Sequence, residues 1–160
     1  MRAGGWPERV PILTGRAWAF GPGVTARLIL PDERKADADL RSHLMTPVDP
    51  SFPSRVAAGD FVVGGGDFAA GTSDDAPARA LLAAGIAAVV ASSFDPAFAR
   101  SALALGLPAV EVNEALAIHT GARLRVDLEG ARVVNLSSGD RYPIRNASDD
   151  FVERFRPREG

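Results

Sequence analysis

The central part of the chain alternates short apolar runs with amphipathic segments. The continuous apolar runs indicate strands that are covered on both faces, as in a parallel sheet. Asp95 and Pro96 open one amphipathic segment as N-cap and first helical residue, and glycines close both segments. The pattern predicts strands at 60–63, 86–92 and 107–112, and helices at 76–85 and 95–106. This order predicts two βαβ crossovers in a parallel sheet.

The segments before the central part predict further strands, and the segments after it predict a hairpin and a helix. Residues 122–139 alternate with period two around Glu129-Gly130, which is typical of a β-hairpin. The remaining elements are expected to be strands at 11–21 and 24–31 and a closing amphipathic helix at 148–156. The sequence therefore predicts a single α/β domain spanning 1–160, in which helices flank a mostly parallel central sheet that carries a C-terminal hairpin.

Residues 32–55 interrupt this regular pattern. The first half is polar with scattered apolar residues, and 46–55 contains three prolines, which disfavour a helix or a central strand. We therefore expect 32–55 to be a mobile connection that lies outside the core. Trp18, Phe94 and Phe98 are expected in the core.

Composition limits the chemistry that the chain can perform alone. It has 160 residues, a formal charge of -2, no cysteine and two histidines. The charge argues against nucleic acid as a partner, and the missing thiolates exclude a disulfide or an iron–sulfur cluster held by this chain. Two histidines far apart in sequence make a metal site improbable. We see no signal peptide in residues 1–10 and no apolar run of membrane-spanning length, so we expect a cytoplasmic protein.

A glycine-rich loop joins the strand at 60–63 to the helix at 76–85. It contains Gly64-Gly65-Gly66, then Ser73 and Asp74 directly before the helix. A strand, a glycine loop and a helix N-terminus can together bind an anion. The same residues also suit a simple helix cap, with Ser73 or Asp74 accepting a backbone hydrogen bond. The residues alone leave both interpretations open.

Three motifs at this point resemble a known family. The first pattern, G-x-N-F-G-x-G-S-S-R-E, matches at Gly65, Phe68, Gly71 and Ser73. The second, G-I-x-A-V-I-A-x-S-F, and the third, N-x-G-L-P, match at Gly85-Ile86, Ala88-Val89-Val90-Ala91, Ser93-Phe94 and Gly106-Leu107-Pro108. Over about residues 15–155 the chain resembles the small subunit of 3-isopropylmalate dehydratase, the swivelling domain of the aconitase superfamily.

The resemblance implies a fold, an activity and a partner. Such a swivel domain docks on a large subunit that carries a [4Fe–4S] cluster, so this chain itself would hold no cofactor. The pair moves a hydroxyl between adjacent carbons of a hydroxy acid. The second serine of the S-S-R-E motif acts as the base and corresponds to Ser73, with Gly71, Thr72 and the loop amides holding its oxyanion. In the family, the segment at 32–55 closes over the substrate. These roles require an accessible Ser73 hydroxyl.

The sequence departs from the family pattern around this serine. The motif arginine is replaced by Asp74, an early acid by Arg27, and the loop arginine by Arg34 one position further on. We place Asp74, Arg27 and Arg34 in the expected substrate-binding set with Gly71 and Thr72. Arg27 and Asp74 either form a swapped ion pair across the site or changed independently.

The departures leave two functions open. The chain is either a subunit of a dehydratase or isomerase whose substrate differs from isopropylmalate, or a non-catalytic swivel protein with a structural or regulatory binding role.

Overall fold

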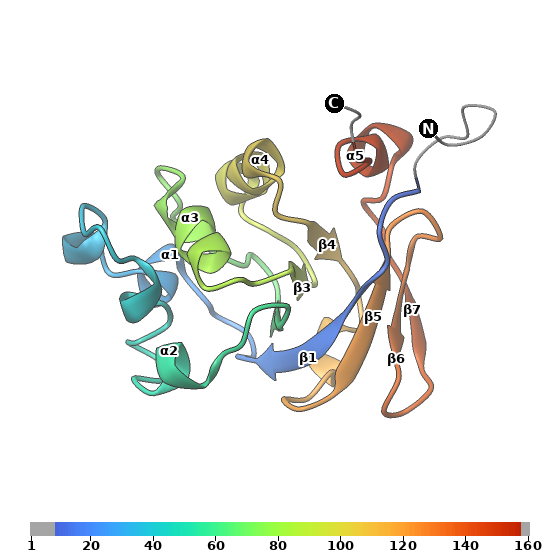
Figure 1. Cartoon of the computed structure of the whole chain (residues 1–160), viewed down its shortest axis with the longest axis horizontal. Coiled ribbons are helices and arrows are strands. Elements are labelled where there is room, and N and C mark those ends of the chain that lie inside the picture. The colour runs from blue at the N-terminus through green and yellow to red at the C-terminus, as the bar shows by residue number, and fades with distance from the viewer. Residues whose placement is uncertain (1–8, 158–160) are drawn as a thin grey trace.

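A computed structural model describes residues 9–157 as a seven-stranded sheet with helices around it (Figure 1). The strands follow the order β4-β3-β2-β1-β5-β6-β7. Neighbours from β1 to β4 pair in parallel, whereas β5, β6 and β7 continue the sheet in antiparallel pairs. The strands are β1 (Leu13–Ala19), β2 (Phe61–Gly64), β3 (Ala88–Ala91), β4 (Ala109–Glu111), β5 (Arg123–Asp127), β6 (Arg132–Asn135) and β7 (Arg141–Pro143).

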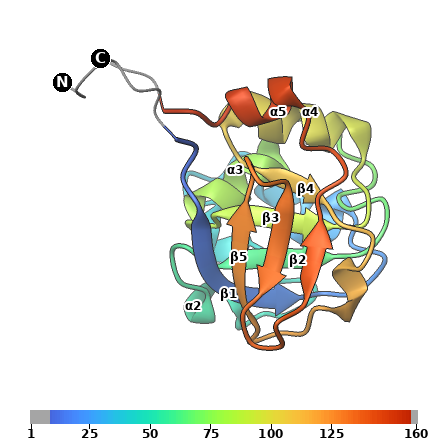
Figure 2. The same ribbon diagram turned by 90° about the vertical axis from the view of Figure 1, so that its right-hand side faces the viewer.

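Helices α1 to α4 gather on one side of the parallel half of the sheet, whereas Val152 of α5 packs in the cluster on the other side. Figure 1 shows α1 to α4 on the side away from β5 to β7, and Figure 2 shows β5 to β7 with no helix in front of them. The α-helices are α1 (Ala26–Ile29), α2 (Phe52–Arg55), α3 (Ala76–Ala83), α4 (Pro96–Leu105) and α5 (Asp149–Glu153). Short 3-10 helices lie at η2 (Asp32–Arg34), η3 (Arg41–His43) and η4 (Ala115–Ala117).

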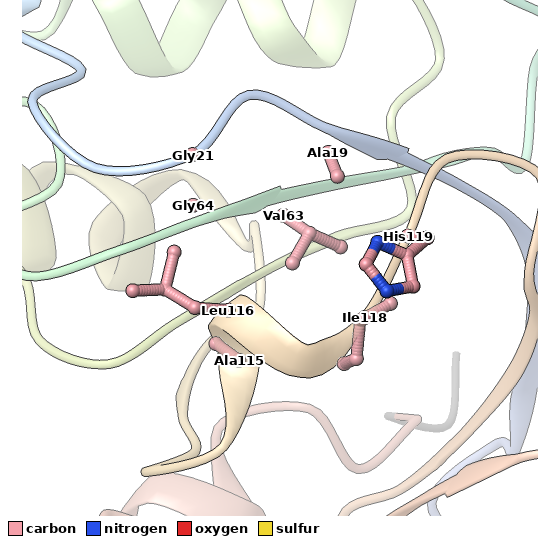
Figure 3. A pocket seen from close by; sticks show the side chains of 8 residues that line it. All are labelled: Ala19, Gly21, Val63, Gly64, Ala115, Leu116, Ile118 and His119. Atoms are coloured by element: carbon pink, nitrogen blue, oxygen red, sulfur yellow. The ribbon is translucent and has the colours of Figure 1, made fainter.

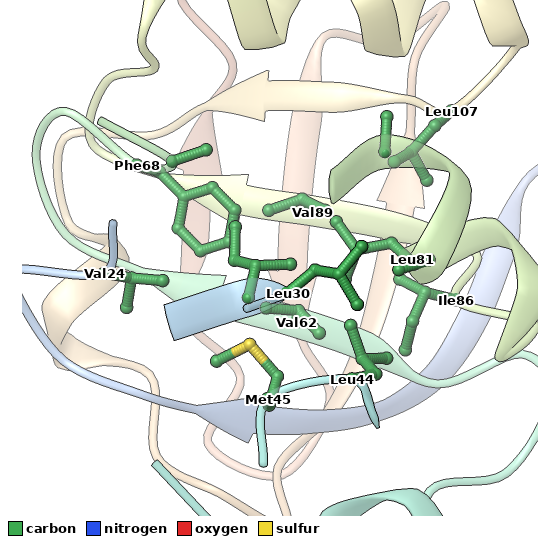
Figure 4. Close-up of a cluster of buried hydrophobic side chains, with 14 of the residues drawn as sticks. Val24, Leu30, Leu44, Met45, Val62, Phe68, Leu81, Ile86, Val89 and Leu107 are labelled. Atoms are coloured by element: carbon green, nitrogen blue, oxygen red, sulfur yellow. The ribbon is translucent and has the colours of Figure 1, made fainter. Parts of the chain in front are cut away.

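The two faces of β2 bury their side chains in two different clusters. Val62 packs under the helices with residues such as Leu81 and Phe68 (Figure 4). Phe61 and Val63 point the other way and pack with Leu124 and other residues of β5 to β7. The sheet therefore curls, so that its antiparallel half covers the second face of its parallel half. Each large apolar side chain buried in this way stabilises the fold by about 1.5–3 kcal/mol.

The predicted parallel core is confirmed. Segments β2, α3, β3, α4 and β4 follow one another, and their strands pair in parallel. At the start of α4 the Asp95 carboxylate accepts a hydrogen bond from Ala97 N at 2.8 Å, and Gly106 ends the helix with φ of +84°. The hairpin at 122–139 and the closing helix are also present. A seventh strand, β7, was not predicted.

The expected strand at 24–31 is wrong, because Ala26–Ile29 form helix α1. Thr25 caps this helix, since its side-chain oxygen accepts a hydrogen bond from Leu28 N at 3.3 Å. Ala26 and Ile29 are buried at a spacing of one helical turn. In so short a segment, the spacing of apolar residues fits both the helical and the strand period. The cap at Thr25 stabilises the helix.

The expectation that 32–55 lies outside the core is also wrong. Leu44, Met45 and Phe52 have no exposed surface, and Met45 N donates a hydrogen bond to Ile29 O at 2.8 Å. The Phe52 ring packs edge-on against Trp18, with ring centroids 5.3 Å apart. A few apolar residues anchor this polar segment over the sheet, while its polar residues face solvent. Its mobility stays a prediction.

Trp18, Phe94 and Phe98 are buried as predicted. The expected absence of a signal peptide concerns residues 1–10, of which 1–8 lie outside the described residues and leave this expectation untested. Within 9–157, no helix has the length and apolar character needed to cross a membrane.

Candidate functional site

The glycines after β2 allow close packing of the chain. A Cβ on Gly64 would lie 2.6 Å from the Phe68 ring, and a Cβ on Gly65 would lie 2.9 Å from the Pro22 Cα. Gly65 N also donates a hydrogen bond to Gly21 O at 3.1 Å. The glycine run therefore lets two segments cross at the end of the sheet, rather than forming a cradle for an anion.

The turn that follows has three residues with positive φ, namely Asp67 at 50°, Ala69 at 66° and Gly71 at 85°. Asp67 and Ala69 occupy the positions where the family pattern has asparagine and glycine, the two residue types that adopt this conformation most easily. Asp67 and Ala69 therefore hold a backbone conformation that is costly for residues other than glycine and asparagine.

Gly71 and Thr72 use their polar groups within the protein. Gly71 N donates to Asp95 Oδ2 at 3.2 Å. Thr72 N and Thr72 Oγ1 both donate to Ala69 O, at 3.2 and 2.6 Å. Neither residue has a donor left for an oxyanion in this structure, because these bonds fix the turn that presents Ser73.

Ser73 is exposed at the end of this turn, as its expected role requires. Lys35 Nζ donates to Ser73 Oγ at 3.4 Å and to Asp74 Oδ2 at 3.1 Å. Lys35 is the only lysine of the sequence. It directly follows η2 and lies within the segment that the resemblance places over the substrate. Sequence reasoning missed Lys35, although its position in that segment and its uniqueness were both visible.

Arg27 and Asp74 do not pair directly. Arg27 Nε bonds Asp32 Oδ2 at 3.0 Å, Asp32 Oδ1 lies 3.2 Å from Lys35 Nζ, and Lys35 continues to Asp74. The hypothesis of a swapped Arg27–Asp74 pair is therefore replaced by a chain of four alternating charges. The physical reason is reach, since Asp32 lies five residues from Arg27 and Lys35 stands next to Asp74.

Asp74 also accepts a hydrogen bond from the first amide of α3, whose N-cap residue is Asp75, and this supports the capping interpretation. The bond joins Asp74 Oδ1 to Ala76 N at 2.9 Å. This backbone bond, and next the Lys35 ammonium, hold the pKa of Asp74 below its usual value. The Asp74 carboxylate in turn raises the pKa of Lys35, with a smaller contribution from Asp32. Lys35 is thus a persistent cation beside Ser73, not a proton acceptor.

Arg34 points to a different partner. Its Nη1 lies 3.7 Å from Asp37 Oδ2, and His43 Nε2 lies 2.9 Å from the same oxygen. Arg34 therefore belongs to a small cluster around Asp37, and its immediate neighbour Lys35 takes the place beside Ser73.

A hollow of about 160 Å³ lies at the carboxyl ends of β1 and β2 (Figure 3). Ala19, Gly64, Leu116 and His119 are among the residues that line it, and Ser73 is not. The residues that line it offer no acid or base apart from His119, so it is not the centre of the expected chemistry.

The described residues offer no site for a metal ion. No group of three or more histidine, aspartate or glutamate side chains is arranged to hold one within 9–157, and the sequence has no cysteine. This chain therefore supplies no cysteine thiolate for an iron–sulfur cluster.

Comparison with known proteins decides the family. The 3-isopropylmalate dehydratase small subunit of Nautilia profundicola is 38% identical over 134 residues, which cover 82% of this chain and 81% of that protein. The chain belongs to the family of 3-isopropylmalate dehydratase small subunits. A second family member, small subunit 1 of Archaeoglobus fulgidus, is 35% identical over 149 residues, covering 91% of this chain and 92% of its own. No protein-family model matches the chain.

Solved structures support the same family. A 3-isopropylmalate dehydratase from Methanocaldococcus jannaschii superimposes with a TM-score of 0.80 at 31% identity, covering 84% of this chain and 82% of its own. Aconitase X from Thermococcus kodakaraensis shares only the fold, with a TM-score of 0.52 at 14% identity over 86% of this chain and 95% of that one. The α/β swivel fold expected from the resemblance is thereby confirmed.

Proposed function

We propose that this chain is the small subunit of an aconitase-superfamily hydro-lyase or isomerase that acts on a hydroxy acid, completed by a large subunit with a [4Fe–4S] cluster. The observation that carries the proposal is the exposed Ser73 hydroxyl, held 3.4 Å from the Lys35 ammonium at the family's motif serine. We further propose that the complex works in the cytoplasm, where cysteine thiolates of a cluster stay reduced.

Ser73 would act as the base on the carbon next to a carboxylate. As its anion, Ser73 Oγ takes the proton from that carbon while a carbon–carbon double bond forms and the C–O bond on the adjacent carbon breaks. The departing hydroxide takes one proton from solvent and leaves as water, and Ser73 returns its proton to solvent. Addition of water in the opposite sense completes an isomerisation. A cluster on the large subunit would supply the Lewis acid for the departing hydroxyl. A serine works as a base only when a nearby cation stabilises its anion. Lys35 provides that cation in place of the motif arginine.

The charges around Ser73 argue for a substrate other than isopropylmalate. Lys35 is already paired with Asp74 and Asp32, and Arg27 with Asp32. Two cations and two anions leave this side of the site neutral, so it offers no free cation for a substrate carboxylate. We propose a hydroxy acid that presents a neutral or cationic group to this chain.

The test is co-expression with a cluster-bearing large subunit from the same genome, followed by a screen of hydroxy acids. Ser73→Ala should abolish turnover of the substrate that the wild-type pair converts. The matched control is Ser101→Ala, a serine in the middle of α4. Equal turnover by Ser73→Ala and wild type would remove Ser73 from the mechanism.

A second function is favoured by Asp74, which stands where the family has a substrate-binding arginine. In that case the chain is a non-catalytic swivel protein with a structural or regulatory role. Such a protein would co-purify with a partner subunit, yet the pair would convert no hydroxy acid and would lose nothing through Ser73→Ala. Turnover that depends on Ser73 excludes this alternative.

A further inference from the structure

Two arginines stand directly opposite each other on neighbouring strands, at the end of the sheet remote from Ser73. Arg16 on β1 pairs in register with Arg123 on β5. Like charges in this arrangement repel and destabilise a sheet. A local rule broken in this way is most often found at functional positions.

The nearby acid pairs with only one of these two arginines. Asp60 Oδ2 accepts hydrogen bonds from Trp18 Nε1 at 2.8 Å and from Ala57 N at 2.9 Å, and Asp60 is 6% exposed. Arg16 reaches the same oxygen at 3.6 Å. Within residues 9–157, the Arg123 side chain has no ion pair. One buried carboxylate, already used by two donors, thus pairs with one of the two guanidinium groups and leaves Arg123 without a counter-ion among the described residues.

A hollow of about 380 Å³ lies between these arginines and the segment before β2. Thr14, Gly15, Arg16 and Arg123 line one side of it, and Ala57 to Asp60 line the other. Ser73 follows β2 whereas Asp60 precedes it, so the hollow is separate from the proposed catalytic turn. Its size suits a small molecule rather than a polymer.

More arginines continue this face over the antiparallel half of the sheet. Arg125 lies two residues from Arg123 and therefore points to the same side. The register places Val134 opposite Arg125 and Arg141 opposite Val134, so Arg141 lies on this face as well. No helix covers it (Figure 2). A concentration of positive charge on a chain whose net charge is -2 attracts anions to this face.

We propose that the hollow between Arg16 and Arg123 binds a small dianion, such as a dicarboxylate or a phosphate. Guanidinium groups form paired hydrogen bonds with carboxylate and phosphate oxygens. A dianion between the two side chains would convert their repulsion into attraction. This site is independent of the proposed hydro-lyase function and would be present in the isolated chain.

Trp18 provides the signal for the test, because the Arg16 guanidinium lies 4.5 Å from the centre of its ring. In a Trp6→Phe background, Trp18 is the only tryptophan of the chain. Malonate and inorganic phosphate are titrated separately at constant ionic strength, with sodium chloride as the balancing salt. A saturable fluorescence change with one or both probes is expected. The relative affinities of the two probes show whether the site prefers carboxylate or phosphate.

Arg123→Gln should weaken this binding by about tenfold or more, as expected for the loss of a charged hydrogen-bond donor. Arg141→Gln is the matched control, an exposed arginine on the same face outside the hollow, and should keep the affinity within about twofold. Thermal unfolding gives a second readout. Without added dianion, Arg123→Gln should unfold at the same temperature as wild type or higher, since a repulsion is removed. With dianion, only wild type and Arg141→Gln should gain stability.

Three results would overturn the proposal. One is a fluorescence response that does not saturate or that chloride reproduces, because this is ionic screening. Another is equal affinity of Arg123→Gln and wild type. The third is a lower unfolding temperature of Arg123→Gln without dianion, which would show that Arg123 has a structural partner.

Discussion

Lys35 Nζ and Asp74 Oδ2 lie 3.1 Å apart and join two segments that are 39 residues distant in sequence. This contact fastens the turn after η2 to the first residues of α3, directly beside Ser73. In the family pattern an arginine directly follows the serine in sequence. In this chain the cation beside the serine is instead a lysine from another part of the chain. The proposed site therefore keeps a cation but changes its origin and its accessibility.

Lys35→Met should reduce kcat of the assembled enzyme by about 10- to 100-fold, because it removes the cation that stabilises the Ser73 oxyanion. Steady-state kinetics with the substrate found by the screen measure this loss. Arg41→Met is the matched control, an exposed cation of the same segment, and should leave kcat within about twofold of wild type. Lys35→Arg should recover part of the activity. A similar loss in both methionine variants would indicate that the segment acts only through its folding.

The pKa of Lys35 should lie above its usual value, chiefly because of the Asp74 carboxylate. Selective carbon-13 labelling of lysine gives a single side-chain signal, since the chain has only one lysine. The titration midpoint should fall in Asp74→Asn. An unchanged midpoint would show that the pair does not form in solution.

The stability that this pair adds should depend on pH with a definite sign. The raised pKa of Lys35 means that its contribution is complete below the unfolded value, about 10.4, and disappears as pH rises through the folded value. The lowered pKa of Asp74 means that its contribution is complete above the unfolded value, about 3.9, and disappears as pH falls through the folded value. Both side chains are partly exposed, so the pair adds at most about 1 kcal/mol.

Asp74 combines a helix cap with a charge, and two substitutions separate these roles. Asp74→Asn keeps an oxygen for Ala76 N and loses only the pair with Lys35, so it should lower the free energy of unfolding by at most about 1 kcal/mol. Asp74→Arg loses both the backbone bond and the pair and should lower it by about 1–2 kcal/mol. Chemical denaturation measures both. In the assembled enzyme, Asp74→Arg should shift preference toward substrates with an additional carboxylate, because it restores the arginine of the family pattern. If the relative kcat/KM values stay the same, the interpretation that this side of the site is neutral is refuted.

Gly71→Ala should destabilise the fold by about 1–2 kcal/mol, because its φ of +85° is unfavourable for any residue with a Cβ. No steric clash adds to this cost, since an added Cβ would have open space around it. Gly66→Ala is the matched control, because its φ is not positive and its Cβ would meet Ser93 Oγ at an ordinary 3.5 Å. Urea denaturation should separate the two variants, and equal stabilities would contradict the assigned turn geometry.

The parallel core could be predicted because its signals are local. The apolar run before the glycines and the cap at Asp95 each fix an element without reference to the rest of the chain. The strand prediction at 24–31 was wrong because the four residues of α1 are too few to distinguish a helical from a strand period. Residues 32–55 failed for a different reason. Their three fully buried anchors, Leu44, Met45 and Phe52, are spaced without either period and gain their burial only from the sheet beneath.

The candidate site divides in the same way. The motif points to Ser73, and the sequence shows an acid, Asp74, where the family pattern has an arginine; the roles of both residues stay predictions. The position of Arg27 opposite Asp74 was inferred from complementary charges, and the structure gives each of them a different partner. Which cation reaches a serine depends on how two distant segments are placed, and no local pattern contains that information.

The amino-acid sequence by itself determined the parallel α/β core, the glycine turn and the motif serine of this family member, because hydrophobic period, caps and turn residues act over a few neighbouring positions. Only the tertiary structure decided that Lys35 stands beside Ser73, that residues 32–55 contribute to the core, and that Arg16 faces Arg123. These relationships depend on strand register and on packing between segments far apart in the chain, where the position of one side chain is set by the whole fold.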